Sequence, residues 1–165
     1  MNILLTKKTI FPLFILTILL QVIVLIYTYY QVAPDEFKMF VREIQTEAFY
    51  QAIAVLVLVV TLVFLVVSIY IFALVSNLIA NYLFKFNLKF NLTFKIIIIY
   101  MFFVTLGVLV FHILIHSDSS LLFYLNPFVF IGLAIVSVII RSEVKARISP
   151  LVFVGLIYVV TIILI

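Results

Sequence analysis

The sequence predicts an all-α, polytopic integral membrane protein: a bundle of about five transmembrane helices, N-terminus inside the cell and C-terminus outside. Hydrophobic residues make up 68% of the 165 residues and charged residues only 10%, whereas a soluble domain has roughly half and a quarter. The charges are confined to short segments between long apolar runs. Most basic residues lie in alternate segments, which is the positive-inside pattern of multi-spanning proteins.

The composition also limits the class of protein. A soluble domain of this size still exposes about a third of its unfolded surface, so water cannot be the solvent for so apolar a chain. We expect one membrane domain over residues 1–165. The net charge of +4 indicates topology and contact with lipid headgroups rather than nucleic-acid binding. Cysteine is absent from the sequence, which excludes disulfides, thiolate metal sites and a cysteine nucleophile.

The first expected span covers residues 9–30, long enough for the ~20 helical residues that cross the hydrocarbon core. Lys7 and Lys8 precede it as in a signal peptide. No small-residue cleavage motif follows, so we expect a retained span. Pro12 lies in the first turn, where proline is tolerated.

An amphipathic helix is predicted in the first loop, over residues 35–50. Phe37, Phe40 and Ile44 recur at helical spacing, while the acidic residues fall elsewhere. This helix either lies on the outer interface or runs straight into the next span. Its apolar face either shields the bundle or docks a partner, and in the second case these three residues are the contacts.

The second span is expected at residues 52–74, with a helical extension to residue 84. Residues 52–84 carry no charge. As one helix, this segment is longer than a single crossing of the membrane needs, and it is too short for two crossings with a turn between them. Asn77 and Asn81 share a face near the inner end. Asparagine in lipid usually bonds to a neighbouring helix, and a ligand or partner contact is the alternative.

Apolar and polar residues alternate strictly over residues 84–95. This period of two favours an extended strand, but a lone strand in lipid would leave backbone groups unpaired. We therefore expect an interfacial connector that buries its phenylalanines, with its conformation left open. Lys85, Lys89 and Lys95 either set topology against the headgroups or dock a cytoplasmic partner.

Three further spans are expected at residues 96–116, 121–140 and 149–165. Asn126 resembles an N-cap with Pro127 at the first helical position. The resulting topology puts eight basic residues and one acid inside, and two basic residues and five acids outside. The opposite orientation would contradict the positive-inside rule. We expect a multi-pass protein of the bacterial cytoplasmic membrane.

Catalytic chemistry has few candidates in this sequence. No charge lies at the centre of a predicted span, which disfavours an ion-coupled transporter, and no hydrolase, zinc-protease or phosphate-loop motif occurs. His112 and His116, one helical turn apart, are weak metal candidates with Asp118 as a third ligand. We expect no catalytic residue, no metal and no cofactor. Polar residues that could meet in the middle of the bundle are Gln21, Ser68, Tyr70 and Thr105, and close helix contacts are expected at Gly107, Gly132 and Gly155.

Several short segments resemble the bacterial branch of the Yip family, the Ypt-interacting-protein-like membrane proteins. They are Ser-Asn-Leu-Ile-Ala at residues 76–80, Phe94-Lys95, Leu-Asn-Pro-Phe at residues 125–128, and Ser149-Pro150. The resemblance covers about residues 50–165. The sequence departs from it in lacking a Gly-Gly pair after the second span and an aromatic residue such as Trp in the fourth. The resemblance implies five spans and a non-enzymatic function, with no functional residue to transfer.

The leading hypothesis is an accessory or interaction subunit of a membrane transporter, with a permease or ATPase as partner. The family resemblance implies, as a specific case, an ABC exporter in self-protection (immunity) against a toxin or bacteriocin. One alternative is a small transporter or substrate-binding subunit with its own ligand pocket. Another is a membrane-embedded enzyme built on His112, His116 and Asp118. The sequence does not specify the partner, the ligand, the oligomeric state or the packing order of the helices.

Overall fold

The structure is a computed structural model that describes residues 6–114, 125–144 and 149–164. Within these ranges every regular element is a helix, which confirms the all-α prediction. Three of the helices, α1, α3 and α4, are long and apolar enough to cross a membrane. The elements are α1 (Lys7–Val32), α2 (Pro34–Thr46), α3 (Ala48–Tyr82), α4 (Phe90–Val108), the π-helical segment η1 (Leu109–Leu114), α6 (Pro127–Glu143) and α7 (Ser149–Leu164).

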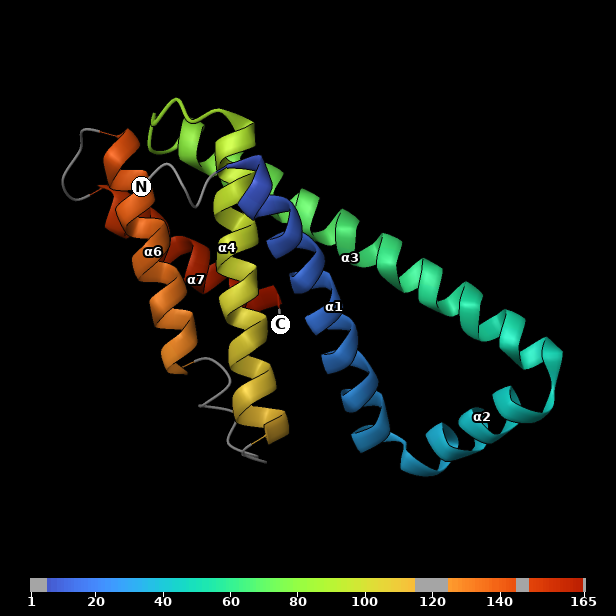
Figure 1. The fold of residues 1–165 in the computed structure, drawn as a ribbon. Helices are drawn as coiled ribbons and strands as arrows, with labels where there is room; N and C mark the ends of the chain where they lie inside the picture. Colours follow the sequence, from blue (N-terminus) through green and yellow to red (C-terminus); the bar gives the residue numbers. More distant parts are fainter. Residues whose placement is uncertain (1–5, 115–124, 145–148, 165) are drawn as a thin grey trace.

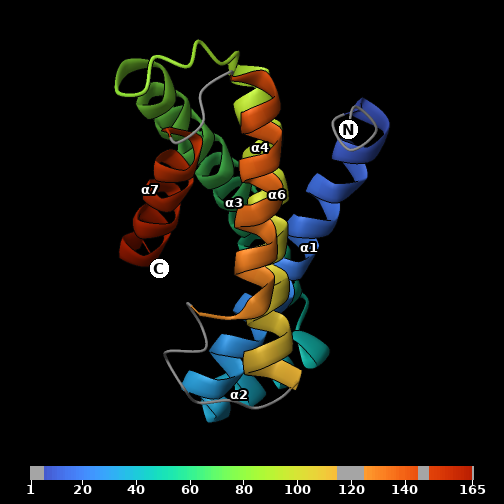
Figure 2. The ribbon, with the colours of Figure 1, turned by 90° about the vertical axis from the view of Figure 1, so that its left-hand side faces the viewer.

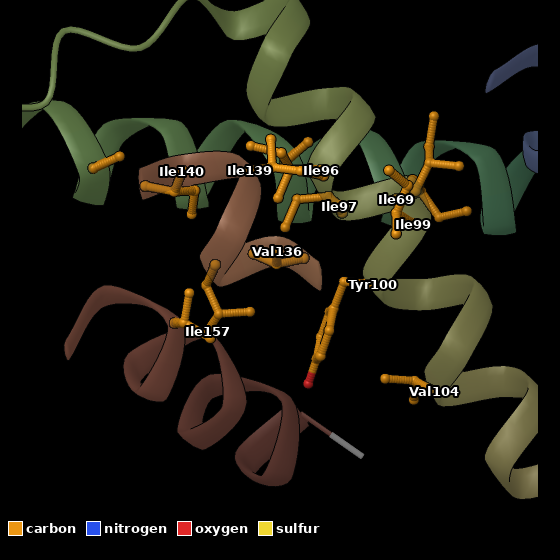
Figure 3. Packing of buried hydrophobic residues seen from close by; sticks show 14 of the residues in the cluster. Ile69, Ile96, Ile97, Ile99, Tyr100, Val104, Val136, Ile139, Ile140 and Ile157 are labelled. Atoms are coloured by element: carbon orange, nitrogen blue, oxygen red, sulfur yellow. The ribbon is translucent and has the colours of Figure 1, made fainter. Parts of the chain in front are cut away.

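Helix α4 forms the centre of the bundle and packs against α1, α3 and α6 (Figure 1). Its residues from Ile96 to Tyr100 are all buried. Side chains of α6 and α7 meet them from the other side, among them Val136, Ile139 and Ile157 (Figure 3). In lipid, which is as apolar as these side chains, van der Waals packing rather than the hydrophobic effect would hold such a core together.

Charged residues gather at the two ends of the bundle. The start of α1, the connector between α3 and α4, and the end of α6 lie at one end, while α2 lies at the other (Figure 1). The first end carries Lys8, Lys85, Lys89, Lys95, Arg141 and Glu143, and the second carries Asp35, Glu36, Lys38, Arg42, Glu43 and Glu47. The alternation of charge along the sequence thus becomes a basic end and an acidic end.

Helix α2 is separate from the span that follows it. Pro34 occupies its first turn, and Glu47 adopts an extended conformation (φ −129°, ψ 125°) before α3 begins. The expectation that this segment runs straight into the next span is therefore wrong. The Phe37 ring packs edge-on against Tyr29 and Tyr30 of α1, with centroid distances of 5.7 and 5.6 Å. These contacts hold the start of α2 against the end of α1, and α2 then leads away towards the start of α3 (Figure 1).

Helix α3 is a single helix of 35 residues, as the long uncharged segment predicts. Its buried residues are Ile69, Ala73, Ser76 and Ala80, all in the C-terminal half. Their spacing of three and four residues makes one face of small side chains that lets α4 approach closely. Towards its N-terminus α3 diverges from α4 (Figure 1).

The connector after α3 alternates inward and outward side chains without being a strand. Lys85 and Asn87 both have a φ of 54°, the left-handed conformation, and α4 already begins at Phe90 rather than at Ile96. The strand that the period of two favours is therefore absent from this described segment. The expected burial is nevertheless present, because Phe84, Phe86 and Leu88 turn inward while Lys85, Asn87 and Lys89 are exposed.

Helix α6 starts with the cap that its sequence predicts. The Asn126 side-chain oxygen accepts a hydrogen bond from the Val129 N–H at 3.0 Å. The helix therefore begins at Pro127 and not at residue 121, and it continues to Glu143, whereas residues 121–124 lie outside the described part.

Two of the three glycines mark close helix contacts. A Cβ at Gly107 would collide with the Asn126 side chain, and one at Gly132 would come within 2.9 Å of the Phe103 Cβ. No atom of the described residues lies within 4 Å of a Cβ at Gly155. The prediction of a close contact is therefore wrong for Gly155.

Helix α7 reaches only part of the way along α4. The Phe153 ring near its start contacts the rings of Phe84 and Phe86 at the basic end. Thr161 near its other end bonds to Tyr100, which lies in the middle of α4, and α7 ends well short of the far end of α4 (Figure 2). Its 16 residues make a helix about 24 Å long, shorter than the hydrocarbon core of ~30 Å.

Candidate functional site

A cavity of about 190 Å³ lies in the middle of the bundle, between α1, α3, α4 and α7. Most of its wall is apolar, with three polar side chains. The lining residues are Gln21 of α1, Leu65, Ser68, Ile69 and Phe72 of α3, Met101 of α4 and Thr161 of α7. An apolar cavity of about 150 Å³ holds a benzene molecule, so this one has room for a small organic ligand.

The side-chain oxygen of Gln21 is buried, and no hydrogen-bond donor among the described residues reaches it. Leaving such an acceptor unsatisfied costs about 1–3 kcal/mol. In native proteins such groups are rare and frequently mark a bound molecule or a functional role. A ligand that brings an O–H or N–H group into the cavity would satisfy this oxygen.

The other two polar groups of the cavity are already bonded within the protein. The Ser68 hydroxyl donates to the Phe64 carbonyl at 2.8 Å. The Thr161 hydroxyl donates to the Ile157 carbonyl at 2.9 Å and lies 3.0 Å from the Tyr100 hydroxyl, which donates to it. The Tyr100 hydroxyl points towards α7 (Figure 3). Gln21 therefore supplies the cavity's buried acceptor that has no partner among the described residues.

The structure brings together two of the four polar residues expected at mid-bundle, Gln21 and Ser68. Tyr70 is exposed and its ring packs on Phe90 at a centroid distance of 5.3 Å. Thr105 is buried and its hydroxyl bonds to the Met101 carbonyl on its own helix. Sequence reasoning missed Thr161, although a threonine in an otherwise apolar helix was a usable signal.

Asn77 and Asn81 hold the connector after α3 in place. The Asn81 side chain donates to the Leu88 carbonyl at 3.0 Å and accepts from the Leu88 N–H at 2.8 Å. The Asn77 amide donates to the same carbonyl at 3.1 Å and to the Thr93 hydroxyl of α4 at 2.8 Å. Asn77 thus bonds to a neighbouring helix, as expected. Both side chains act within the chain, so neither is available to a partner.

The remaining interaction candidates are dispersed. Lys85 and Lys89 are exposed on the connector, whereas Lys95 is half-buried in α4 and lines a groove with Lys8. Phe37 packs on α1, and Phe40 and Ile44 are half-buried on the same face of α2. Lys95 thus lines a groove that Lys85 and Lys89 do not line, and docking of a partner by the three lysines stays a prediction.

The proposed metal ligands fall largely outside the described part of the structure. His116 and Asp118 belong to the undescribed residues 115–124, and the side chain of His112 is not described either. Among the residues that are described, no group of three His, Cys, Asp or Glu side chains could hold a metal ion.

Comparison of the chain with protein-family models, with curated proteins and with solved structures found no match. The resemblance to the Yip family therefore stays a prediction that rests on the sequence segments alone.

Proposed function

We propose that this chain is a non-enzymatic, multi-pass protein of the bacterial cytoplasmic membrane that acts as an accessory subunit of a membrane transporter. The observation that carries the proposal is the lack of buried side chains in the N-terminal half of α3. Residues 48–68 include no buried side chain, although the rest of the helix packs into the bundle. Leu62 and Leu65 pack against the core from one side of this half, and its opposite side is left exposed.

The exposed half of α3 is suited to contact another transmembrane helix. Its outward residues are mainly valine and leucine, with Val55, Val59 and Val63 each at least half exposed. Valine has one strongly preferred rotamer in a helix, so it loses little side-chain entropy when a neighbour packs against it. Helix association in lipid depends on such packing. A permease helix lying along this face is the partner we propose.

The exporter assignment rests on the Yip-like segments. These segments favour a partner that is the permease or ATPase of an ABC exporter, acting in self-protection against a toxin or bacteriocin. A photo-crosslinking amino acid at Val59 tests both parts of the proposal. Val159 on α7 is the matched control, because the two side chains are 50% and 52% exposed.

We expect the Val59 probe, irradiated in native membranes, to form a covalent adduct with a transporter subunit that mass spectrometry identifies. The Val159 probe should give lipid adducts only. The proposal fails if both positions give only lipid adducts, or if the Val59 adduct is with proteins unrelated to transport.

The same proposal includes five spans with the N-terminus and the basic end in the cytoplasm. The separation of basic and acidic ends supports this orientation, and local thinning of the bilayer accommodates the short α7. Reporter fusions test it: a periplasm-active reporter after Glu47 and after Ile165 should be active at both sites. Inactivity after Glu47 would reverse the orientation, and inactivity after Ile165 alone would leave four crossings.

A second candidate function, a substrate-binding subunit with its own pocket, is favoured by the unsatisfied Gln21 oxygen in the cavity. Benzyl alcohol and toluene test it, because they have similar size and only the alcohol carries an O–H donor. We expect benzyl alcohol to raise the melting temperature more than toluene in the wild type and not in Gln21→Leu. An equal effect of the two compounds in both proteins would remove this candidate.

A further inference from the structure

A groove of about 490 Å³ lies between the first turns of α1 and α4, at the basic end of the bundle. The two helices contact each other here through the rings of Phe14 and Phe94, whose centroids are 6.0 Å apart. The lining residues are Lys8, Ile10, Phe11 and Phe14 of α1 and Asn91, Phe94, Lys95 and Ile98 of α4.

The groove combines an apolar wall with a polar rim. Ile10 and Ile98 are buried at its base, while the Phe11 side chain is 66% exposed along the wall. Lys8 and Asn91 are exposed, and Lys95 is half-buried. The charged side chains that line the groove, among the described residues, are both lysines. A ligand that fits must carry both an acidic group and a hydrophobic part.

We propose that this groove is a specific site for one anionic phospholipid. The headgroup phosphate would lie between Lys8 and Lys95, and an acyl chain would run along Phe11, Phe14 and Ile98. The position fits, because Lys8 lies at the start of one helix that is apolar enough to cross a membrane and Lys95 lies in the first turns of another, which is the level of the headgroups. A neutral lipid would bring no net negative charge to the lysines, and a soluble phosphate would not contact the apolar wall.

This site differs from the general attraction of basic segments to anionic membranes. Lys85 and Lys89 lie at the same end of the bundle but do not line the groove. General attraction would treat all four lysines alike, whereas a built site depends on Lys8 and Lys95. The double variant Lys85→Gln/Lys89→Gln is therefore a control that removes the same charge elsewhere.

The experiment is native mass spectrometry of the full chain in neutral detergent, titrated with dioleoylphosphatidylglycerol. We expect the wild type and Lys85→Gln/Lys89→Gln to retain one tightly bound lipid. Lys8→Gln/Lys95→Gln should bind it about 30-fold more weakly, since each lysine near the headgroups contributes about fivefold. Because Lys95 is half-buried, Lys8→Gln alone gives a second test at an exposed position, with binding about fivefold weaker.

Three results would overturn the proposal. Equal weakening by the two double variants would show diffuse attraction. Equal binding of dioleoylphosphatidylcholine would show that the acidic headgroup is not recognised. Binding of glycerol 3-phosphate as tight as that of the lipid would identify a phosphate site that does not use the apolar wall.

Discussion

Replacing Asn81 with leucine should detach the connector between α3 and α4 from the bundle. The Asn81 amide and Leu88 form a two-bond pairing, with the side chain donating to the Leu88 carbonyl and accepting from its N–H. Leucine has a similar size and can do neither. The Leu88 carbonyl keeps its bond from Asn77 at 3.1 Å, but the Leu88 N–H loses the acceptor that Asn81 supplies.

The size of the effect follows from the loss of the acceptor for the Leu88 N–H. Leu88 is only 7% exposed, and a buried donor without a partner costs about 1–3 kcal/mol. We therefore expect Asn81→Leu to lower the free energy of unfolding by about 2 kcal/mol, a factor of about 30 in the folding equilibrium. Asn77→Leu leaves both Leu88 groups bonded to Asn81, so it should cost only about 0.6 kcal/mol, the average for a polar contact between membrane helices.

Denaturation in mixed micelles measures the stability of the variants, and amide hydrogen exchange reports on the Leu88 N–H directly. We expect this amide to exchange about 30-fold faster in Asn81→Leu. Asn91→Leu, at an exposed position of α4, is the control and should match the wild type. Unchanged stability with unchanged protection at Leu88 would refute the reasoning, as would a larger loss in Asn77→Leu than in Asn81→Leu.

Three further predictions concern the helix contacts and the cavity. Gly107→Ala should destabilise the protein by about 1–3 kcal/mol, because the new Cβ would displace the capping side chain of α6; Gly155→Ala, which meets open space, should leave the melting temperature unchanged or slightly raised. Tyr100→Phe should lower the free energy of unfolding, measured by chemical denaturation, by about 0.6 kcal/mol. The loss is small because the Thr161 hydroxyl keeps its own bond to the Ile157 carbonyl. An unchanged free energy would mean that the bond between α4 and α7 contributes nothing. Gln21→Leu should stabilise the ligand-free protein by about 1–3 kcal/mol in a thermal unfolding assay, since it removes a buried acceptor without a partner, and a destabilised variant would show that this oxygen is satisfied.

Local signals in the sequence predicted much of the helical framework. The start of α6 could be read from Asn126 and Pro127, because an N-cap acts within one turn. The connector was harder. A strand and a segment with left-handed residues at Lys85 and Asn87 both alternate side chains with a period of two. The hydrogen bonds from α3 to Leu88 favour the second conformation, and they depend on the tertiary structure.

The candidate sites were less predictable than the helices. Both sites are lined by residues from different helices, up to 140 positions apart in the sequence. The groove has Lys8 and Lys95, and the cavity has Gln21, Ser68 and Thr161. Periodicity along one helix contains no information on which face meets which neighbour. In a chain this apolar the uncertainty is greater, because lipid-facing and bundle-facing side chains are chemically alike.

By itself, the sequence predicted a helical protein with helices apolar and long enough to cross a membrane, where those helices lie, and which loops carry positive charge. These properties follow from composition and from contacts within a few residues, since lipid demands that each segment satisfy its own backbone. The tertiary structure alone decided that α4 is central, that the N-terminal half of α3 has no buried side chain, and that a cavity and a groove exist. Those features depend on how side chains from distant segments pack, which no local pattern specifies.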